Sequence, residues 1–473
     1  MKQYLLPKEI IDSKNVCNLI SLKKRRERQV ILNTSDKWLN SLTNAFSGYI
    51  VLDFGKEMNG GVRIITSVCE KSFSKIRIRF GESISEVYSN IGEKGATNDH
   101  NPRDFETCLS SLGDHSFGKT GFRFVRIDFL EQEKIVLQNI YCENNILNKK
   151  ANYVYGGKDR LVGDIYKTAK RTIDLCSAGE YIVDGIKRDR LVWVGDLHPE
   201  MLALVTLYGR LPIIERSLEF VKKHTQDEDW MNGISTYSMW WAIIVTDYYF
   251  LTCAKDFILK HIDYLKFLID KFDVCVDKNG ELNYGWLFVD WQTTDSLDAE
   301  AGVRAINLIC VKNIIKLFNE LGVETKKAQG LLKKLNKKSI KVQKMKQVVA
   351  LKYFAEGMID DSDYKLLISN NAAGMSTFMS YYILKAVASK DVKLAITMMK
   401  EYYGAMLELG ATTFFEDFDI EWIKDSTKLN QLAIDGQKDF HGDNGAHCYE
   451  GFRHSLCHGW SSGVIKFIKE YCD

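Results

Sequence analysis

The pattern of hydrophobic and polar positions divides the chain into a strand-like first third and a helix-like remainder. Up to about residue 150, short runs rich in Val, Ile, Phe and Tyr alternate with Gly, Asn, Asp and Ser, as antiparallel strands and their turns do. The runs span residues 48–52, 62–68, 75–80, 122–129 and 134–140. They predict an N-terminal β-sandwich or jelly-roll domain over residues 1–150. The segment 83–120 is too long for a hairpin turn, so it is either a plain excursion loop or a loop that reaches over the second domain.

From about Gly156 onward, apolar residues recur at the three- and four-residue spacing of amphipathic helices. The runs span residues 202–211, 213–221, 240–251 and 306–317. Pro199 and Pro212 each come just before such a run, where a proline at the first helical position is tolerated. At about 27 residues per helix and loop, about twelve helices fit into residues 151–473. Twelve helices can close into an (α/α)6 toroid, and the periodicity alone equally permits an open bundle or a solenoid.

Charge and chain composition narrow the classes of function. The 64 basic and 62 acidic residues leave a net charge of +2 over 473 residues, so nothing favours nucleic acid or an anionic membrane as a partner. Pro7, Lys8 and Glu9 interrupt the first apolar residues before a signal-peptide core can form, and no apolar run reaches the thickness of a bilayer. We therefore expect a soluble cytoplasmic protein, whose oligomeric state the sequence does not indicate.

The eleven cysteines are scattered without a Cys-x-x-Cys pair, which indicates reduced thiols. Some of them lie near histidines close to the C-terminus, in the order His441, His447, Cys448, His454, Cys457 and His458. Two of these histidines have a four-residue spacing, which can place two metal ligands on one helical face. The order of the set matches no standard zinc frame, so we expect neither a metal nor another cofactor.

Three polar segments hold the residues best suited to catalysis. The first, residues 184–196, mixes three aspartates with arginines and a tryptophan and follows no helical or strand period. The second, residues 410–419, is Gly-Ala-Thr-Thr-Phe-Phe-Glu-Asp-Phe-Asp, and the third, residues 455–463, is Ser-Leu-Cys-His-Gly-Trp-Ser-Ser-Gly. Carboxylates near one another and near aromatic rings can have separated pKa values, as an acid and a base in one site require. For the first segment, a solvated surface loop is the alternative.

Taken in order, the three segments resemble motifs of the α-L-rhamnosidases of glycoside hydrolase family 78. The first third of the chain is also similar to the β-sandwich that precedes the barrel in that family, at residues 52–57, 80–82 and 121–125. The resemblance covers most of the chain and implies a mainly α fold, in which an (α/α)6 toroid follows the β-sandwich. It implies an inverting glycoside hydrolase that releases terminal α-L-rhamnose from glycosides or oligosaccharides and needs no cofactor.

The resemblance also implies roles for single residues. Asp189 stands at the position of the general acid, where many members carry Glu, and Glu416 stands at the position of the catalytic base. Asp has one methylene less than Glu, so either the loop brings its carboxyl closer or Asp184 or Asp196 is the acid. The residues expected to bind the sugar are Asp184, Arg188, Trp193, Asp196, Trp240, Asp290, Trp291, His458 and Trp460. For the histidine, and for the tryptophans outside the 184–196 segment, burial in the core is the alternative.

Two other functions fit the same motifs. A glycosidase with the same toroid could act on another deoxysugar or on a uronic acid, because a fold does not fix the substrate. A non-catalytic carbohydrate-binding relative would keep the pocket without the acid, and the Asp at position 189 gives this alternative weight. The rates of hydrolysis of a panel of aryl glycosides distinguish the rhamnosidase from these two other functions.

Overall fold

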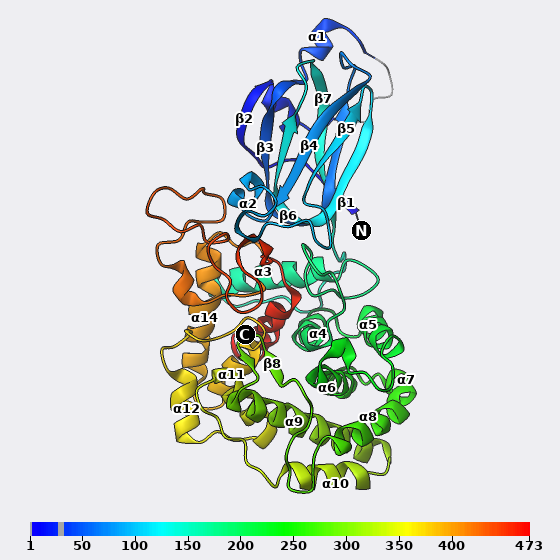
Figure 1. Ribbon diagram of the computed structural model, residues 1–473, viewed down its shortest axis with the longest axis vertical. Coiled ribbons are helices and arrows are strands. Elements are labelled where there is room, and N and C mark those ends of the chain that lie inside the picture. The colour runs from blue at the N-terminus through cyan, green and yellow to red at the C-terminus, as the bar shows by residue number, and fades with distance from the viewer. Residues whose placement is uncertain (1, 27–32) are drawn as a thin grey trace.

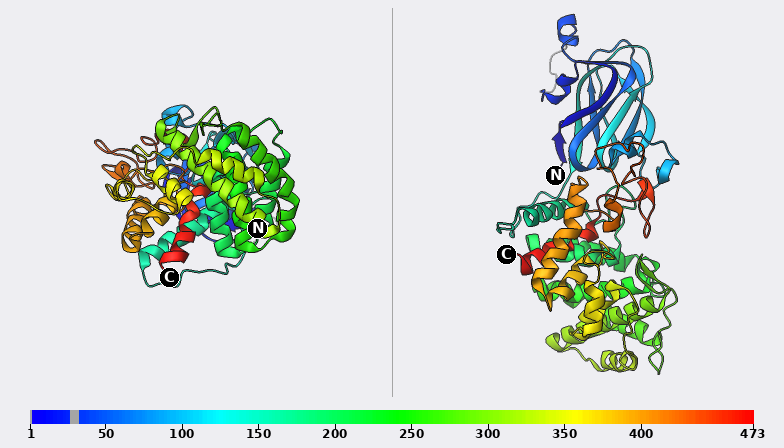
Figure 2. Two further views of the ribbon diagram at one scale, coloured as in Figure 1. Left: turned by 90° about the horizontal axis from the view of Figure 1, so that it is seen from below. Right: turned by 90° about the vertical axis from the view of Figure 1, so that its left-hand side faces the viewer.

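The protein, described here by a computed structural model of residues 2–26 and 33–473, consists of a β domain stacked on a helical domain (Figure 1). Figure 2 shows the same stacking from a second direction. The strands of the β domain are β1 (Lys2–Leu5), β2 (Glu9–Cys17), β3 (Thr43–Thr66), β4 (Phe73–Gly81), β5 (Asp104–Ser110), β6 (Asp114–Phe129) and β7 (Ile135–Asn145). Two short helices accompany them, α1 (Asp36–Leu39) and α2 (Ile84–Tyr88).

The strands are hydrogen-bonded into one sheet in the order β1-β7-β3-β6-β4-β5, with β2 paired to β3. β3 is 24 residues long and has an irregularity between Asp53 and Met58. Before it, β3 pairs with β2 and, at residues 43–45, also with β7; beyond it, residues 60–66 of β3 pair with β7. The sheet buries apolar residues that include Phe80, Phe122 and Ile127. Hydrogen bonds thus link all seven strands, counted over the described residues, into one sheet. The sandwich or jelly-roll arrangement of the first domain stays a prediction.

The helical domain follows the last strand of the sheet. Its helices are α3 (Arg160–Cys176), α4 (Val194–Tyr208), α5 (Pro212–Lys223), α6 (Ser235–Thr252), α7 (Lys255–Ile258), α8 (Ile262–Val274), α9 (Leu297–Leu321), α10 (Lys326–Leu335), α11 (Lys346–Glu356), α12 (Asp361–Ile368), α13 (Ser380–Ala388), α14 (Val392–Glu408) and α15 (Val464–Tyr471). A short ladder of β8 (Phe288–Asp290) and β9 (Thr293–Thr294) precedes α9. Within the described residues, no helix combines the length and the apolar character that crossing a membrane requires. The boundary at residue 150 and a cytoplasmic location stay predictions.

Local signals explain where several helices begin. Asp159 caps α3 by accepting backbone N–H bonds in the first turn, and Ser296 does the same for α9. Pro212 is at the first position of α5, as predicted. The prediction for Pro199 is wrong, because this proline lies inside α4, which begins at Val194. The apolar period starts later than the helix because the first turns of α4 carry the polar residues Asp196, His198 and Glu200.

Six helices of the second domain pack in a closed series. α4 packs against α6, α6 against α9, α9 against α11, α11 against α13, α13 against α15, and α15 against α4. α10, α12 and α14 pack on members of this series. Large side chains such as Trp240, Tyr382 and Tyr402 are fully buried in the core that results. The first turn of α4 and the segment that leads into α15 are thereby held close together.

The fold class predicted from the sequence, mainly α with an (α/α)6 toroid, is wrong for this chain. Helices contain 43% of the residues and strands 20%, so the large sheet rules out a mainly α class. The helices of the second domain also vary from 4 to 25 residues, and residues 410–463 form loops and short 3-10 turns. The count based on average helix lengths had assigned these aperiodic residues to helices.

The segment 83–120 is not one loop, because it contains α2 and β5. The residues between these two elements extend to the helical domain, where Asp99 pairs with Arg453 at 2.7 Å. The β domain thus contributes directly to the region where the polar segments of the helical domain lie.

Candidate active site

The three polar segments identified in the sequence lie side by side in the structure. Gly185 of the first segment forms a β-bridge with His458 of the third. The backbone N–H of Glu416, in the second segment, donates to the carbonyl oxygen of Ser455 at 2.9 Å. Residues far apart in the sequence therefore form one site at the junction of the two domains.

The β domain holds the first segment in a strained turn. Thr120 donates its hydroxyl to the carbonyl oxygen of Lys187 at 3.2 Å, and Arg190 bonds the carbonyl oxygen of Lys119. Asp189 and Arg190 have φ values of 50° and 57°. This left-handed region costs residues other than glycine about 1 kcal/mol or more each. The contacts from the β domain hold the turn that presents Asp189.

Glu416 is buried and receives hydrogen bonds from three groups. Nη2 of Arg188 donates to Oε1 at 2.6 Å and to Oε2 at 2.7 Å. The thiol of Cys448 donates to Oε1, and the backbone N–H of Ser455 donates to Oε2, both at 2.9 Å. Burial acts most strongly and raises the pKa of Glu416, but the charge and hydrogen bonds of Arg188, together with the neighbouring His458 and His454, hold the pKa well below its ordinary value. Glu416 is therefore ionised at neutral pH.

The guanidinium of Arg188 also joins Glu416 to Asp189. Its Nη1 lies 2.7 Å from Oδ1 of Asp189 while Nη2 bonds Glu416. Two bonds of about 1.33 Å separate these nitrogens, so the bridged carboxylate oxygens are at most about 8 Å apart. This limit admits the lower part of the roughly 6.5–9.5 Å range of an inverting pair and also the roughly 5–5.5 Å of a retaining pair. Asp189 also faces His100 of the β domain, whose Nε2 lies 3.3 Å from Oδ1.

His458 lies among three carboxyl groups. Its Nε2 is 3.7 Å from Asp184, 3.8 Å from Asp196 and 4.0 Å from Glu416. Burial lowers the pKa of His458 to about 4. Burial also raises the pKa values of Asp184 and Asp196 well above their ordinary values, and neighbouring carboxylates raise them further. Burial therefore disfavours the charged form of the imidazole and the charged forms of the two aspartates alike.

A pocket lies beside Glu416 and is also lined by Asp290, Trp291 and Trp460. Asp290 accepts the hydroxyl of Ser376 at 2.7 Å, and burial raises its pKa to about 6. Trp291 is 40% exposed, and the indole N–H of Trp460 donates to the carbonyl oxygen of Glu416 at 3.0 Å. Aromatic walls with a few convergent polar groups are typical of small-molecule sites.

Two of the tryptophans expected to bind the sugar, Trp193 and Trp240, are not among the residues that line this pocket. Trp240 is 1% exposed and packs on Phe378, which in turn stacks on Trp460. Its position is that of a core aromatic, one ring removed from the pocket. Trp193 precedes α4 and packs edge-on against Tyr237, at 6.1 Å between ring centroids.

Three residues of the site were missed as site residues by reasoning from the sequence. Cys448 was considered only as a metal ligand, yet its thiol bonds Glu416. The ring centroid of Tyr449 lies 3.5 Å from Cζ of Arg188, a cation–π contact. His100 comes from the β domain. Neither Tyr449 nor His100 belongs to a sequence motif, so only the folded chain identifies them as residues of the site.

Comparisons with known proteins bear on this site. No protein-family model matches the chain, and no curated protein matches it in sequence. Solved structures do match. A rhamnosidase from Klebsiella oxytoca with rhamnose bound covers 100% of this chain and 96% of its own, with a TM-score of 0.75 and 16% identity. This chain shares the fold of α-L-rhamnosidases.

Two further rhamnosidase structures match with lower coverage of their own chains. A family 78 rhamnosidase from a Bacillus species covers 89% of this chain and 46% of its own, with a TM-score of 0.69 and 17% identity. The α-L-rhamnosidase of Aspergillus terreus covers 90% of this chain and 52% of its own, with a TM-score of 0.63 and 15% identity. This chain spans about half the length of these two rhamnosidases and nearly all of the Klebsiella rhamnosidase. The rhamnosidase fold therefore extends over both domains described above.

Proposed function

We propose that the chain is an inverting glycoside hydrolase that releases terminal α-L-rhamnose from glycosides or oligosaccharides. The observation that carries the proposal is the Arg188 guanidinium, which bridges Asp189 and Glu416 beside a pocket with tryptophan walls. The three ordered motifs and the fold shared with rhamnosidases, one of which has rhamnose bound, support it.

In the proposed reaction, the protonated form of Asp189 gives its proton to the glycosidic oxygen as the bond between that oxygen and the anomeric carbon breaks, and Asp189 is left as a carboxylate paired with Arg188. A water molecule attacks the anomeric carbon from the opposite face, and Glu416 takes its proton. Rhamnose of inverted configuration and an alcohol are released. The ionised state of Glu416 suits a base, and its negative charge would stabilise the oxocarbenium-like transition state.

The surroundings of the pocket favour a neutral sugar over a uronic acid. We propose that Asp184, Asp196, Asp290 and His458 bind sugar hydroxyls and that the 6-methyl group of rhamnose packs on an indole ring. The Arg188 guanidinium is already shared by two carboxylates. A uronate would therefore add another anion to a site that is rich in carboxyl groups.

A second assignment of the general acid also has support. Burial raises the pKa values of Asp184 and Asp196 well above their ordinary values, which favours the protonated form that an acid catalyst needs. Asp184 uses Oδ1 to accept the N–H of Leu191 at 2.9 Å. The leaving-group dependence of an Asp189 variant, described in the Discussion, distinguishes the assignments.

The function itself is tested with a panel of nitrophenyl glycosides. The wild-type protein should hydrolyse the α-L-rhamnoside with a kcat/KM at least about tenfold above that for the α-L-fucoside or the β-D-glucuronide. The Glu416→Gln protein, purified in parallel, controls for contaminating glycosidases. Preference for the fucoside or the glucuronide would favour a glycosidase of other specificity. Rhamnose binding without turnover of any substrate would favour a non-catalytic protein.

Arg188→Met should move the acid limb of the pH profile of kcat/KM to higher pH. A base works only when ionised, so activity is present above its pKa and is lost as the pH falls through it. In the wild type, burial acts to raise the pKa of Glu416, and the Arg188 charge is the largest of the influences that together hold it below its ordinary 4.5. Without that charge, burial raises the pKa. Arg188→Lys keeps the positive charge and is the control, and an acid limb that does not move in Arg188→Met would contradict the account.

A further inference from the structure

Glu82 directly follows β4 and contacts the segment that holds Glu416. Its Oε2 accepts the backbone N–H of Leu456 at 2.7 Å, and its Oε1 accepts the hydroxyl of Ser455 at 3.2 Å. The N–H of Ser455 in turn donates to Oε2 of Glu416 at 2.9 Å. Glu82 is 1% exposed. A buried carboxylate of the β domain thus fixes the two residues beside the carboxylate that we propose as the base.

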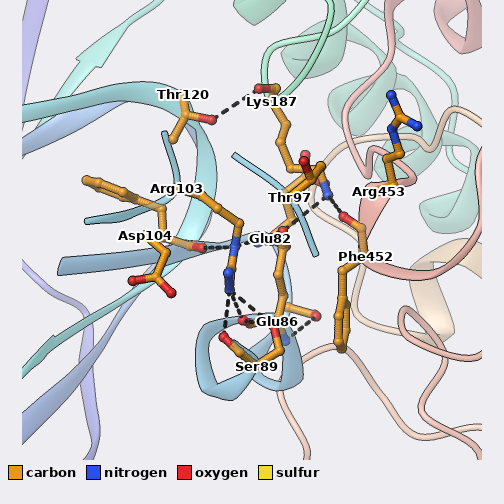
Figure 3. Close-up of polar contacts among 12 residues, drawn as sticks. Glu82, Glu86, Ser89, Thr97, Arg103, Asp104, Thr120, Lys187, Phe452 and Arg453 are labelled. Carbon is orange, nitrogen blue, oxygen red and sulfur yellow. Dashed lines mark hydrogen bonds and ion pairs between the residues drawn. The ribbon is translucent and has the colours of Figure 1, made fainter. Parts of the chain in front are cut away.

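Lys187 supplies the positive charge that this buried carboxylate needs. Its Nζ lies 3.0 Å from Glu82 and 3.4 Å from Glu86, and it donates to the carbonyl oxygens of Phe452 at 2.8 Å and His454 at 2.7 Å. Figure 3 shows Lys187 reaching from its loop toward Glu82 and Glu86, with Phe452 on the other side. The ammonium is surrounded by acceptors, as a buried ion pair requires.

The same place has the ligand set of a metal site, but the lysine occupies its centre. One ligand atom each of Glu82, Glu86 and His441 lies within 4.8 Å of the others. The ammonium of Lys187 lies 3.5 Å from Nε2 of His441 as well as close to both glutamates. A divalent cation in this position would repel the ammonium. The chain's own lysine therefore serves as the cation, and it ties the 184–196 segment to the β domain.

We propose that Glu82 is a positioning residue for Glu416: with Lys187 as its counter-ion, it fixes residues 455 and 456, so the β domain sets the orientation of the catalytic base. The inference rests on the proposed function. With Oε2 of Glu416 held by Ser455, Oε1 is the oxygen that faces Cys448 at the pocket. A displacement of about 1 Å in a catalytic group can cost about 100-fold in rate.

Glu82→Gln tests the proposal because it keeps the size of the side chain but leaves one acceptor oxygen for two donors. We expect kcat to fall about 10- to 100-fold while KM stays within about twofold of wild type. The fall should be equal for a rhamnoside that releases an acidic phenol and for one that releases a basic alcohol. Equal losses are the signature of a displaced base, since a missing acid spares the acidic phenol.

Two further variants complete the test. Glu143→Gln is the matched control, because Glu143 is a mostly buried carboxylate on β7 that pairs with Lys2 and Ser116; its kcat should equal that of wild type. Ser455→Ala removes the hydroxyl that Glu82 accepts but keeps the N–H that Glu416 accepts. The kcat of Ser455→Ala should fall less than that of Glu82→Gln, again equally for both leaving groups. Ser455→Ala takes the place of Glu82→Gln in the test if thermal unfolding shows that Glu82→Gln does not fold.

The outcomes separate the positioning role from the proposed function. The positioning role is overturned if a folded Glu82→Gln protein, or the Ser455→Ala protein in its place, has the kcat of wild type. It is also overturned if kcat falls only for the rhamnoside with the basic leaving group. A wild-type protein that hydrolyses no α-L-rhamnoside overturns the proposed function, and the positioning role falls with it. The wild-type rate alone therefore shows which of the two has failed.

Discussion

Replacing Glu416 by Gln is expected to lower kcat by about 100- to 10,000-fold on every rhamnoside, whatever its leaving group. Each substrate needs an activated water molecule, so an acidic phenol cannot compensate for a missing base. Gln keeps an acceptor oxygen for Arg188 and Ser455, but its amide cannot take a proton. Azide needs no deprotonation, so it should restore part of the rate and yield the β-L-rhamnosyl azide.

The control for this variant comes from the same part of the chain. Glu421→Gln changes an exposed carboxylate five residues further on and should keep the wild-type rate. Thermal unfolding must accompany the kinetics, because Gln leaves the buried Arg188 paired with Asp189 alone. A folded Glu416→Gln protein that retains kcat within about tenfold of wild type would contradict the role of a base.

Asp189→Asn is expected to lower kcat by about 100- to 10,000-fold on rhamnosides with basic leaving alcohols and to spare most of the rate on an aryl rhamnoside with an acidic phenol. An acid is needed only when the departing oxygen is too basic to leave without a proton. The rate is measured over a series of phenols, and its dependence on the phenol pKa should become steeper in the variant. If the variant loses as much on the activated substrate as on the natural one, Asp196 and Asp184 are the next acids to test.

The backbone gives a physical reason for Asp at position 189, where many rhamnosidases of family 78 carry Glu. The φ of 50° at Asp189 lies in the left-handed region, which Asp and Asn tolerate better than other side chains with a Cβ. Asn therefore preserves the turn while removing the acid, so a loss of activity in Asp189→Asn can be attributed to the missing proton donor.

The fold class predicted from the sequence is wrong, and the roles of the site residues stay predictions, but the segments that carry those residues do lie together in the structure. The strand pattern of the first third and the grouping of the 184–196, 410–419 and 455–463 segments both appear in the structure. The count based on average helix lengths assigned residues 410–463 to helices, although these residues form loops and short 3-10 turns. Hydrophobic periodicity also could not show that α4 begins before Pro199, because the first turns of α4 carry polar residues. Similarly, composition cannot separate a core indole such as Trp240 from one that lines the pocket.

The contribution of the β domain could not be predicted, because it depends on contacts between residues that are distant in sequence. Glu82 lies 373 positions from Ser455, and His100 faces a carboxylate of another domain. Neither residue belongs to a motif that indicates catalysis. Only the folded chain shows that Lys187 is directed at a pair of buried glutamates, Glu82 and Glu86.

The central claim, an inverting hydrolysis by Asp189 and Glu416, is tested most directly by proton NMR during the first minutes of turnover of an aryl α-L-rhamnoside. The account predicts that the anomeric signal of β-L-rhamnose appears first and that the α-anomer grows only as the free sugar mutarotates. If α-L-rhamnose is the first product, the configuration is retained, and the water-activating role of Glu416 is contradicted.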